Sequence, residues 1–396
     1  MRNTKPSIRF DGFTDDWVQR KFGELYKKVN EKNDLSFGQD RVISVANMYF
    51  KDSADIRSDD SYMRTYNIFR IGDIAFEGNR SKYFSYGRFV ENTIGDGIIS
   101  HVFDVFRPIV EFDLTYWKYA IHNERIMGRI LMTSTTSSTM MTNLVSKDFL
   151  KRSTLVPSVS EQEKIGSFFK QLDNTIDLHQ RQLDLLKEQK KGFLQKMFPK
   201  QGEKIPELRF AEFTDDWVQR KVGDFLTESR IPGTNGAISK KLTVKLWGKG
   251  VIPKETVTDG SEATKYYVRK AGQFMYGKLD FLHAAFGIVP ENLDGYESTL
   301  DSPSFDIANL NSTFLMDTVM RKSFYLYQGN IANGSRKAKR IHVDTFSNMP
   351  IDVTTLDEQD KIGHFFDRLD NLIAANQRKL DLLKELKKGY LQKMFV

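Results

Sequence analysis

Basic side chains stand beside aromatic residues and glycines in one stretch of the first half of the chain. The residues concerned are Arg80, Lys82, Tyr83 and Arg88. Arginine and lysine bind the phosphates and guanine edges of nucleic acids, and hydroxyl groups add hydrogen bonds. We therefore treat this stretch as a candidate for DNA contact. A solvated basic surface is the alternative interpretation.

The second half offers a comparable pattern. Lys278 lies two residues after Tyr276, and a dense basic run follows at 335–340. The same chemistry applies to these residues, with the run as the stronger candidate. The basic residues of the run are Arg336, Lys337, Lys339 and Arg340.

Motifs that would support catalysis are missing from the sequence. There is no phosphate-binding glycine loop ending in Lys-Ser/Thr, no Gly-x-Gly-x-x-Gly after a strand, and no Asn-Pro-Pro-aromatic tetrad. The six histidines are scattered, and cysteine is absent. We expect no catalytic residue, no metal site and no cofactor in this chain, which favours binding over catalysis.

Composition limits the possible partners and compartments. A net charge of +7 and a pI near 9.1 favour polyanionic partners. No apolar run approaches the roughly 18 residues of a membrane helix, and the first residues lack the apolar segment of a secretory signal. A chain without cysteine fits a reducing compartment, so we expect a cytoplasmic protein.

The chain contains an internal sequence repeat of two copies. Residues 13–21 recur without change at 213–221, an offset of 200. The segment 161–166, Glu-Gln-Glu-Lys-Ile-Gly, returns with one change at 358–363, an offset of 197. A period this long excludes solenoid repeats of ~20–50 residues and predicts two whole domains, each followed by a helix. Trp17 and Trp217 are expected in the two cores.

Between these matched ends the halves diverge and keep only a skeleton. It consists of Gly72 with Gly272, Gly87 with Gly287, and Glu91-Asn92 with Glu291-Asn292. A scaffold that reads two different ligands would show this pattern of constant ends and changed interiors. Short β-rich runs bounded by glycine and polar clusters predict mixed α/β interiors.

Residues 160–198 predict one long helix, capped by Ser160 with Glu163; Asp357 and Asp360 take these places in the second copy. Apolar residues recur at spacings of four and three, which is typical of a coiled-coil seam. The seam positions are Ile165, Phe169, Leu172, Ile176, His179, Leu183 and Leu186, then Ile362, Phe366, Leu369, Ile373, Asn376, Leu380 and Leu383.

Charge indicates how the two helices pair. Each is acidic in its first half and basic in its second, which suits its own dipole and also an antiparallel partner. We predict antiparallel pairing, because it lets one chain fold back on itself. His179 and Asn376 are matching polar breaks near the middle of the seam, and we expect them to meet and fix the register. Exposure of both residues is the alternative.

With the repeat and both helix segments in hand, the chain resembles the specificity subunits of type I restriction–modification enzymes. The marks are Arg9-Phe10 and residues 13–21 with their copies, and the segments 161–198 and 358–395. The resemblance implies a pseudo-twofold chain of two mixed α/β target-recognition domains joined by two antiparallel coiled-coil helices. The expected parts are target-recognition domain 1 (1–158), central helix (159–198), linker (199–207), target-recognition domain 2 (208–356) and C-terminal helix (357–396).

The resemblance also implies partners. Each variable domain of such subunits reads one half of a bipartite site in double-stranded DNA. The helices hold two methyltransferase subunits, which use S-adenosylmethionine to methylate adenine. Restriction subunits that use ATP and magnesium then join. These activities and cofactors belong to the partners, so the resemblance assigns no catalytic residue to this chain.

Two other hypotheses fit parts of the sequence. A duplicated coiled-coil structural or adhesin-like protein would explain the helices, but it predicts neither basic charge nor divergent interiors. A self-sufficient modification enzyme would need the cofactor motifs that are missing.

Overall fold

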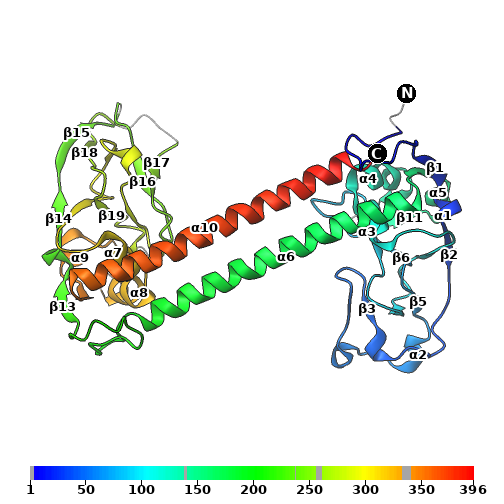
Figure 1. Ribbon diagram of the computed structural model, residues 1–396, viewed down its shortest axis with the longest axis horizontal. Coiled ribbons are helices and arrows are strands. Elements are labelled where there is room, and N and C mark those ends of the chain that lie inside the picture. The colour runs from blue at the N-terminus through cyan, green and yellow to red at the C-terminus, as the bar shows by residue number, and fades with distance from the viewer. Residues whose placement is uncertain (1–3, 138–140, 237, 256–260, 332–339) are drawn as a thin grey trace. The chain divides into compact units, whose positions relative to one another are not determined.

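A computed structural model of the chain describes residues 4–137, 141–236, 238–255, 261–331 and 340–396 (Figure 1). The chain divides into two compact units. Unit 1 comprises Met1–Gln180 and Arg378–Val396, and unit 2 comprises Arg181–Gln377. Two long helices, α6 (Val159–Lys196) and α10 (Leu356–Lys393), each contribute one half to each unit. The predicted mixed α/β class with two long helices is confirmed.

Unit 1 is built on a four-stranded antiparallel sheet in the order β2-β9-β6-β7. A separate pair, β1 with β12, joins the start of the unit to the residues just before α6. The strands are β1 (Val18–Lys21), β2 (Tyr26–Val29), β3 (Ile43–Ser44), β4 (Tyr49–Phe50), β5 (Asn67–Phe69), β6 (Ile74–Glu77), β7 (Arg88–Glu91), β8 (Gly97–Ile99), β9 (Val105–Pro108), β10 (Thr135–Ser137), β11 (Thr142–Leu144) and β12 (Ser153–Val156). The shorter helices are α1 (Phe22–Leu25), α2 (Asp60–Met63), α3 (Leu114–His122), α4 (Glu124–Met132) and α5 (Ser146–Lys151).

Unit 2 repeats this plan. Its four-stranded sheet has the order β14-β22-β19-β20, and β13 pairs with β23 as β1 pairs with β12. The strands are β13 (Val218–Lys221), β14 (Leu226–Ser229), β15 (Ile231–Asn235), β16 (Leu242–Val244), β17 (Val251–Pro253), β18 (Lys265–Val268), β19 (Phe274–Tyr276), β20 (Phe286–Ile288), β21 (Glu297–Ser298), β22 (Ser304–Ile307) and β23 (Pro350–Val353). The helices are α7 (Ser312–Val319), α8 (Lys322–Ile331) and α9 (Val343–Ser347).

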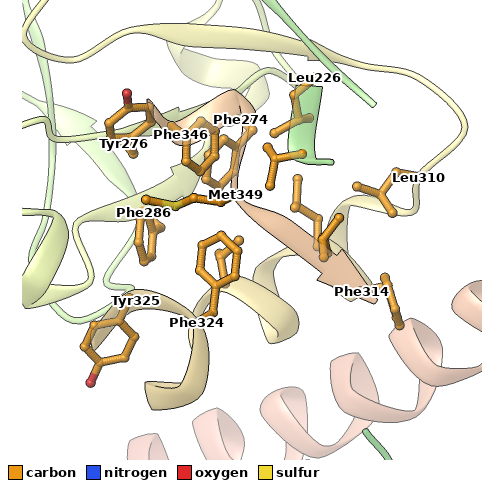
Figure 2. Close-up of a cluster of buried hydrophobic side chains, with 14 of the residues drawn as sticks. Leu226, Phe274, Tyr276, Phe286, Leu310, Phe314, Phe324, Tyr325, Phe346 and Met349 are labelled. Atoms are coloured by element: carbon orange, nitrogen blue, oxygen red, sulfur yellow. The ribbon is translucent and has the colours of Figure 1, made fainter. Parts of the chain in front are cut away.

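Aromatic side chains fill the core of each unit. In unit 2 the ring of Phe346 lies 4.6 Å from Tyr276 and 5.8 Å from Phe274, measured between ring centroids (Figure 2). Trp17 and Trp217 are buried in the two cores, as predicted. Large aromatic surfaces removed from water supply much of the hydrophobic stabilisation of domains of this size.

The caps of both long helices lie two residues before the predicted positions. The hydroxyl of Ser158, rather than Ser160, accepts a hydrogen bond from the first turn of α6, and Thr355 does the same for α10. The prediction was wrong because α6 and α10 begin at Val159 and Leu356, so the hydroxyls of Ser158 and Thr355 already stand at the cap positions. None of the described helices has the continuous apolar stretch that a membrane span requires.

Within each unit the two helix halves run antiparallel, as the charge pattern predicts. In unit 1 Lys387 Nζ lies 2.5 Å from an Asp173 carboxylate oxygen, and in unit 2 Lys190 Nζ lies 2.6 Å from Asp370. Lys190 and Lys387 follow Leu186 and Leu383 by four residues, so both lie at seam positions. Each contacts the acidic half of the other helix. Lysine is therefore tolerated in the seam because it has a carboxylate opposite.

The predicted seam residues lie at buried or partly buried positions. A continuous seam and the pairing of His179 with Asn376 would join the two units, and both stay predictions. In unit 2 the Asn376 amide donates to Leu372 O of its own helix at 2.9 Å. The buried positions are Ile165, Phe169, Leu183, Ile362, Phe366 and Leu380, and the partly buried ones are Leu172, Ile176, His179, Leu186, Leu369, Ile373, Asn376 and Leu383.

The repeated skeleton is only partly equivalent in space. Gly72 and Gly272 have φ of 82° and 83°, and each donates its N–H to the residue that follows the edge strand of its sheet, Asn92 or Val289. Asn92 therefore corresponds to Val289, not to Asn292, and Glu91 has no counterpart in Glu291. The pairing of Gly87 with Gly287 also fails, since only Gly87 has a left-handed φ. Segments of different length between the strands shift the alignment.

Glu91 is a buried carboxyl at the end of β7. It is 2% exposed, and neither carboxyl oxygen has a hydrogen-bond partner among the described residues. Removal from water disfavours the ionised form, and this desolvation raises the pKa of Glu91 to about 9. Glu91 is therefore protonated in the folded chain at neutral pH.

The variant Glu91→Gln should flatten the pH dependence of stability. Between about pH 5 and about pH 9 the folded chain keeps a proton that the unfolded chain has lost. The unfolding free energy therefore falls by up to about 1.4 kcal/mol per pH unit through this group. Denaturant titrations at several pH values give the slope, which should be smaller in the variant. Equal slopes would show that Glu91 is ionised in the folded chain.

Arg269 is a fully buried cation in unit 2. Its guanidinium donates to the hydroxyls of Ser298 and Ser304 and to four backbone carbonyls, at 2.8–3.4 Å. No carboxylate lies among these acceptors, and burial lowers the pKa of Arg269 to about 10. The side chain ties the segment 298–304 to β14 and β18.

Replacement of Arg269 by methionine should lower the unfolding free energy by roughly 2–4 kcal/mol, because several buried oxygens lose their donors. Arg220→Met is the control, since Arg220 is 56% exposed and its partner Asp224 is 43% exposed. Urea unfolding of both variants measures the difference. A methionine variant as stable as the control would refute the structural role of Arg269.

Candidate nucleic-acid interface

A buried ion pair fixes the start of unit 1 to α6. Arg9 Nε donates to Glu161 Oε1 at 2.7 Å and Arg9 Nη2 donates to Glu161 Oε2 at 2.8 Å. The Trp17 indole N–H donates to the same carboxylate at 3.2 Å. Donation of these hydrogen bonds to Glu161 raises the pKa of Arg9 above its ordinary value. A bidentate arginine–carboxylate pair fixes orientation as well as distance.

Unit 2 carries the same pair. Arg209 Nε and Nη2 donate to the two oxygens of Glu358, each at 2.7 Å. The glutamines next in sequence also act alike: Gln162 Oε1 accepts from the N–H of Asp113 at 3.1 Å, and Gln359 from that of Asn311 at 3.0 Å. The repeated Glu-Gln pair thus holds the residue that caps α3 or α7.

The repeated glycine of this motif allows close packing. A Cβ at Gly166 would lie 2.3 Å from the Asp113 carboxylate, and a Cβ at Gly363 would lie 2.7 Å from the Asn311 amide oxygen. The Glu-Gln-x-Lys-Ile-Gly motif is therefore explained by the fold. We call this arrangement of ion pair, capping glutamine and glycine the frame of each unit.

Inside the frame, equivalent positions carry different chemistry. In unit 1 Arg107 of β9 donates to Asp73 at 2.9 Å, and its guanidinium also binds Glu31 at 2.6 Å. In unit 2 the same place in the sheet holds Asp306 and Gln273, joined by a hydrogen bond of 2.8 Å. The two interiors therefore keep one backbone plan and present different side chains.

The candidate residues of unit 1 lie in one loop between β6 and the start of β7. Arg80 and Lys82 are exposed, and Tyr83 is 73% exposed at the turn. Arg88 differs: its Nε donates to Glu77 at 2.6 Å, Nη2 donates to Ala46 O at 2.7 Å, and its guanidinium lies over the Phe84 ring. Much of the hydrogen-bonding capacity of Arg88 is thus used inside the unit.

The candidates of unit 2 gather around Asp301. Arg340 Nη2 lies 3.0 Å from the Asp301 carboxylate, and the backbone N–H of Lys278 donates to Asp301 O at 2.9 Å. Partial burial lowers the pKa of Lys278. Arg336, Lys337 and Lys339 lie outside the described residues. The structure therefore brings Lys278 and Arg340 together, and DNA contact by these residues stays a prediction.

The exposed tryptophan of unit 2 was not among the candidates. Trp247 lies in the turn of the β16–β17 hairpin, is 53% exposed, and stands between Lys245 and Lys249. In the sequence, the only feature that could have indicated this residue is its position as a single tryptophan among lysines and glycines. Among the described residues, no three acidic or histidine side chains gather into a group that could hold a metal ion.

Residues 14–188 match a sequence family described as type I restriction modification DNA specificity domain. No curated protein sequence matches the chain. In fold, the chain is similar to the S subunit of the type I restriction–modification system of M. genitalium, with 12% identity, a TM-score of 0.56 and 99% of each chain covered.

Two further solved structures have the same fold. The HsdS subunit from Thermoanaerobacter tengcongensis is 15% identical, with a TM-score of 0.50 and 96% of each chain covered. A chain from a study of complex assembly and conformational transition of a type I system is 13% identical, with a TM-score of 0.52 and 96% and 97% covered. Residues 14–188 are therefore similar to the DNA specificity domain of type I restriction–modification systems, and nearly the whole chain has the fold of solved specificity subunits.

Proposed function

We propose that each unit reads one half of a bipartite site in double-stranded DNA, and that the chain has no catalysis of its own. The observation that carries the proposal is the change of chemistry inside a constant frame. Arg107 with Asp73 in unit 1 and Asp306 with Gln273 in unit 2 occupy the same place in the same sheet. One scaffold with two sets of side chains suits two different half-sites.

The repeated surface supports two copies of one partner. Asp15, Asp16 and Val18 are exposed in unit 1, and their identical copies at 215, 216 and 218 are exposed in unit 2. The cores do not require these exposed residues to match, whereas two copies of one partner would. We infer that the partners are two methyltransferase subunits, which bring S-adenosylmethionine. Restriction subunits with ATP and magnesium would join the same complex.

A structural or adhesin-like role is the other candidate. Such a role gives no reason for the two interiors to differ inside one frame, and the family match at 14–188 points to DNA. Gel-shift assays with and without a methyltransferase partner separate these proposals. Preferential binding of one duplex sequence supports DNA recognition. Equal binding of all duplex sequences, both with and without the methyltransferase partner, contradicts it.

Exchange of residues 22–155 for the matching segment of another specificity subunit should change only one half of the recognised site. The segment begins after β1 and ends within β12, so the exchange leaves Arg9, Glu161 and unit 2 in place. Methylome sequencing of cells with the parent and the chimaera identifies both half-sites. A change in both halves would contradict independent reading.

Alanine at Arg336, Lys337, Lys339 and Arg340 should weaken DNA binding and reduce its salt dependence. Removal of each phosphate contact lowers the log–log salt slope on duplex DNA by about 0.9. Lys200→Ala with Lys204→Ala, outside both interiors, is the control and should leave the slope unchanged. An unchanged slope in the four-residue variant would show that the run is only a solvated surface.

A further inference from the structure

The β16–β17 hairpin of unit 2 is a separate two-stranded ribbon (Figure 1). Thr243 pairs with Ile252 at its centre, and the N–H of Lys245 donates to Gly250 O at 2.9 Å at the tip. Trp247 stands in the turn that follows. The major groove of B-DNA admits a two-stranded ribbon of this kind.

Trp247 is held in a conformation that non-glycine residues rarely adopt. Its φ is 62°, and φ of Ala284, which faces it, is 48°. The N–H of Trp247 donates to His283 O at 2.8 Å, and the N–H of Gly248 donates to Ala284 O at 2.9 Å. Left-handed conformations of bulky residues are strained and persist where surrounding structure enforces them, often at binding sites. The hairpin tip is thus fixed to the body of unit 2.

The exposure of Trp247 sets it apart from the other tryptophans of the chain. Trp17, Trp117 and Trp217 are 2–3% exposed, whereas Trp247 is 53% exposed. Lys245 and Lys249 beside it are exposed as well, and the His283 ring lies 5.6 Å from the indole, between centroids. An apolar ring between two cations suits a ligand with flat bases and flanking phosphates.

Unit 1 has a corresponding β-hairpin with different residues at its tip. Its β3–β4 hairpin carries Met48 with φ of 49° and Tyr49 at 51% exposure. Both ribbons are extended by one matching bond, from Lys51 N–H to Val42 O and from Lys254 N–H to Lys241 O, each within 2.9 Å. Arg88 anchors this tip through Ala46 O, which gives Arg88 a positioning role.

We propose that the two hairpin tips contact the bases of the two half-sites, through Trp247 in unit 2 and through Tyr49 in unit 1. This inference rests on the proposed reading of DNA and deepens it. A protein partner present in two copies would contact the same residues in both units, as at the exposed Asp15, Asp16 and Val18 and their identical copies. The tips differ, which fits two different half-sites. Lys245 and Lys249 then lie where they can bind the phosphates on either side of the groove.

The test uses the full chain in complex with a methyltransferase partner, and a DNA duplex that carries both halves of the motif that the complex methylates. We call the half read by unit 1 the first half-site and the half read by unit 2 the second half-site. Trp247→Gly removes the indole, and glycine accepts a φ of 62° without strain, so the variant should fold normally. We expect binding to be roughly 5- to 150-fold weaker, the range for one mismatched base pair. On a duplex with the second half-site scrambled, variant and parent should bind alike.

Tyr49→Ala is the matched control in the other unit. It should weaken binding only to duplexes with an intact first half-site, and Trp247→Phe should keep most of the affinity. A parent chain that does not discriminate between the duplexes would refute the proposed function itself. If the parent chain distinguishes the intact duplex from the scrambled one, and a stable Trp247→Gly variant distinguishes them equally well, the role of the hairpin is refuted and the proposed function is not.

A spectroscopic measurement checks contact directly. The chain labelled with 5-fluorotryptophan has four fluorine signals, one per tryptophan, and Trp247→Phe identifies the signal of Trp247. The motif duplex should shift this signal and leave those of the three buried tryptophans in place. A signal that the motif duplex leaves unmoved, under conditions of saturated binding, contradicts the proposal.

Discussion

A buried arginine–glutamate pair is the contact on which each unit depends. The carboxylates of Glu161 and Glu358 are almost wholly removed from water, and the paired arginine offsets the cost of burying each carboxylate. The pair joins the residues before the first strand to the first turn of a long helix, more than a hundred residues away in sequence. The ends of the recognition interior are thereby closed, and the interior can vary without opening the unit.

This contrast between a constant frame and a variable interior supports the proposal that one fold reads two half-sites. The frame uses identical residues in both units because its geometry is demanding: a bidentate pair, a capping glutamine and a glycine without room for a methyl group. The interior keeps only backbone pairing, so an arginine–aspartate pair in one unit can become an aspartate–glutamine pair in the other. The hairpin tips differ as well, with Trp247 exposed in unit 2 and Tyr49 exposed in unit 1.

Periodicity and repeated motifs predicted the two long helices and the buried Trp17 and Trp217. The charge pattern predicted the antiparallel direction of the helix halves within each unit. The cap was misplaced because Ser158 and Ser160 are both suitable capping residues, and α6 begins at Val159. Glu91 and Glu291 looked equivalent in sequence, yet different connecting segments move them apart. Likewise, nothing local shows that Arg88 binds Glu77, or that Trp247 is exposed while the other tryptophans are buried.

The most direct test of a frame used twice is hydrogen exchange, measured by mass spectrometry, on Arg9→Gln and Arg209→Gln. Loss of one partner from a buried ion pair costs about 3–5 kcal/mol, so local opening should become much more frequent. We expect faster exchange in 1–180 and 378–396 for Arg9→Gln, and in 181–377 for Arg209→Gln. Faster exchange throughout the chain in either variant would contradict it, because the two units would then stand or fall together.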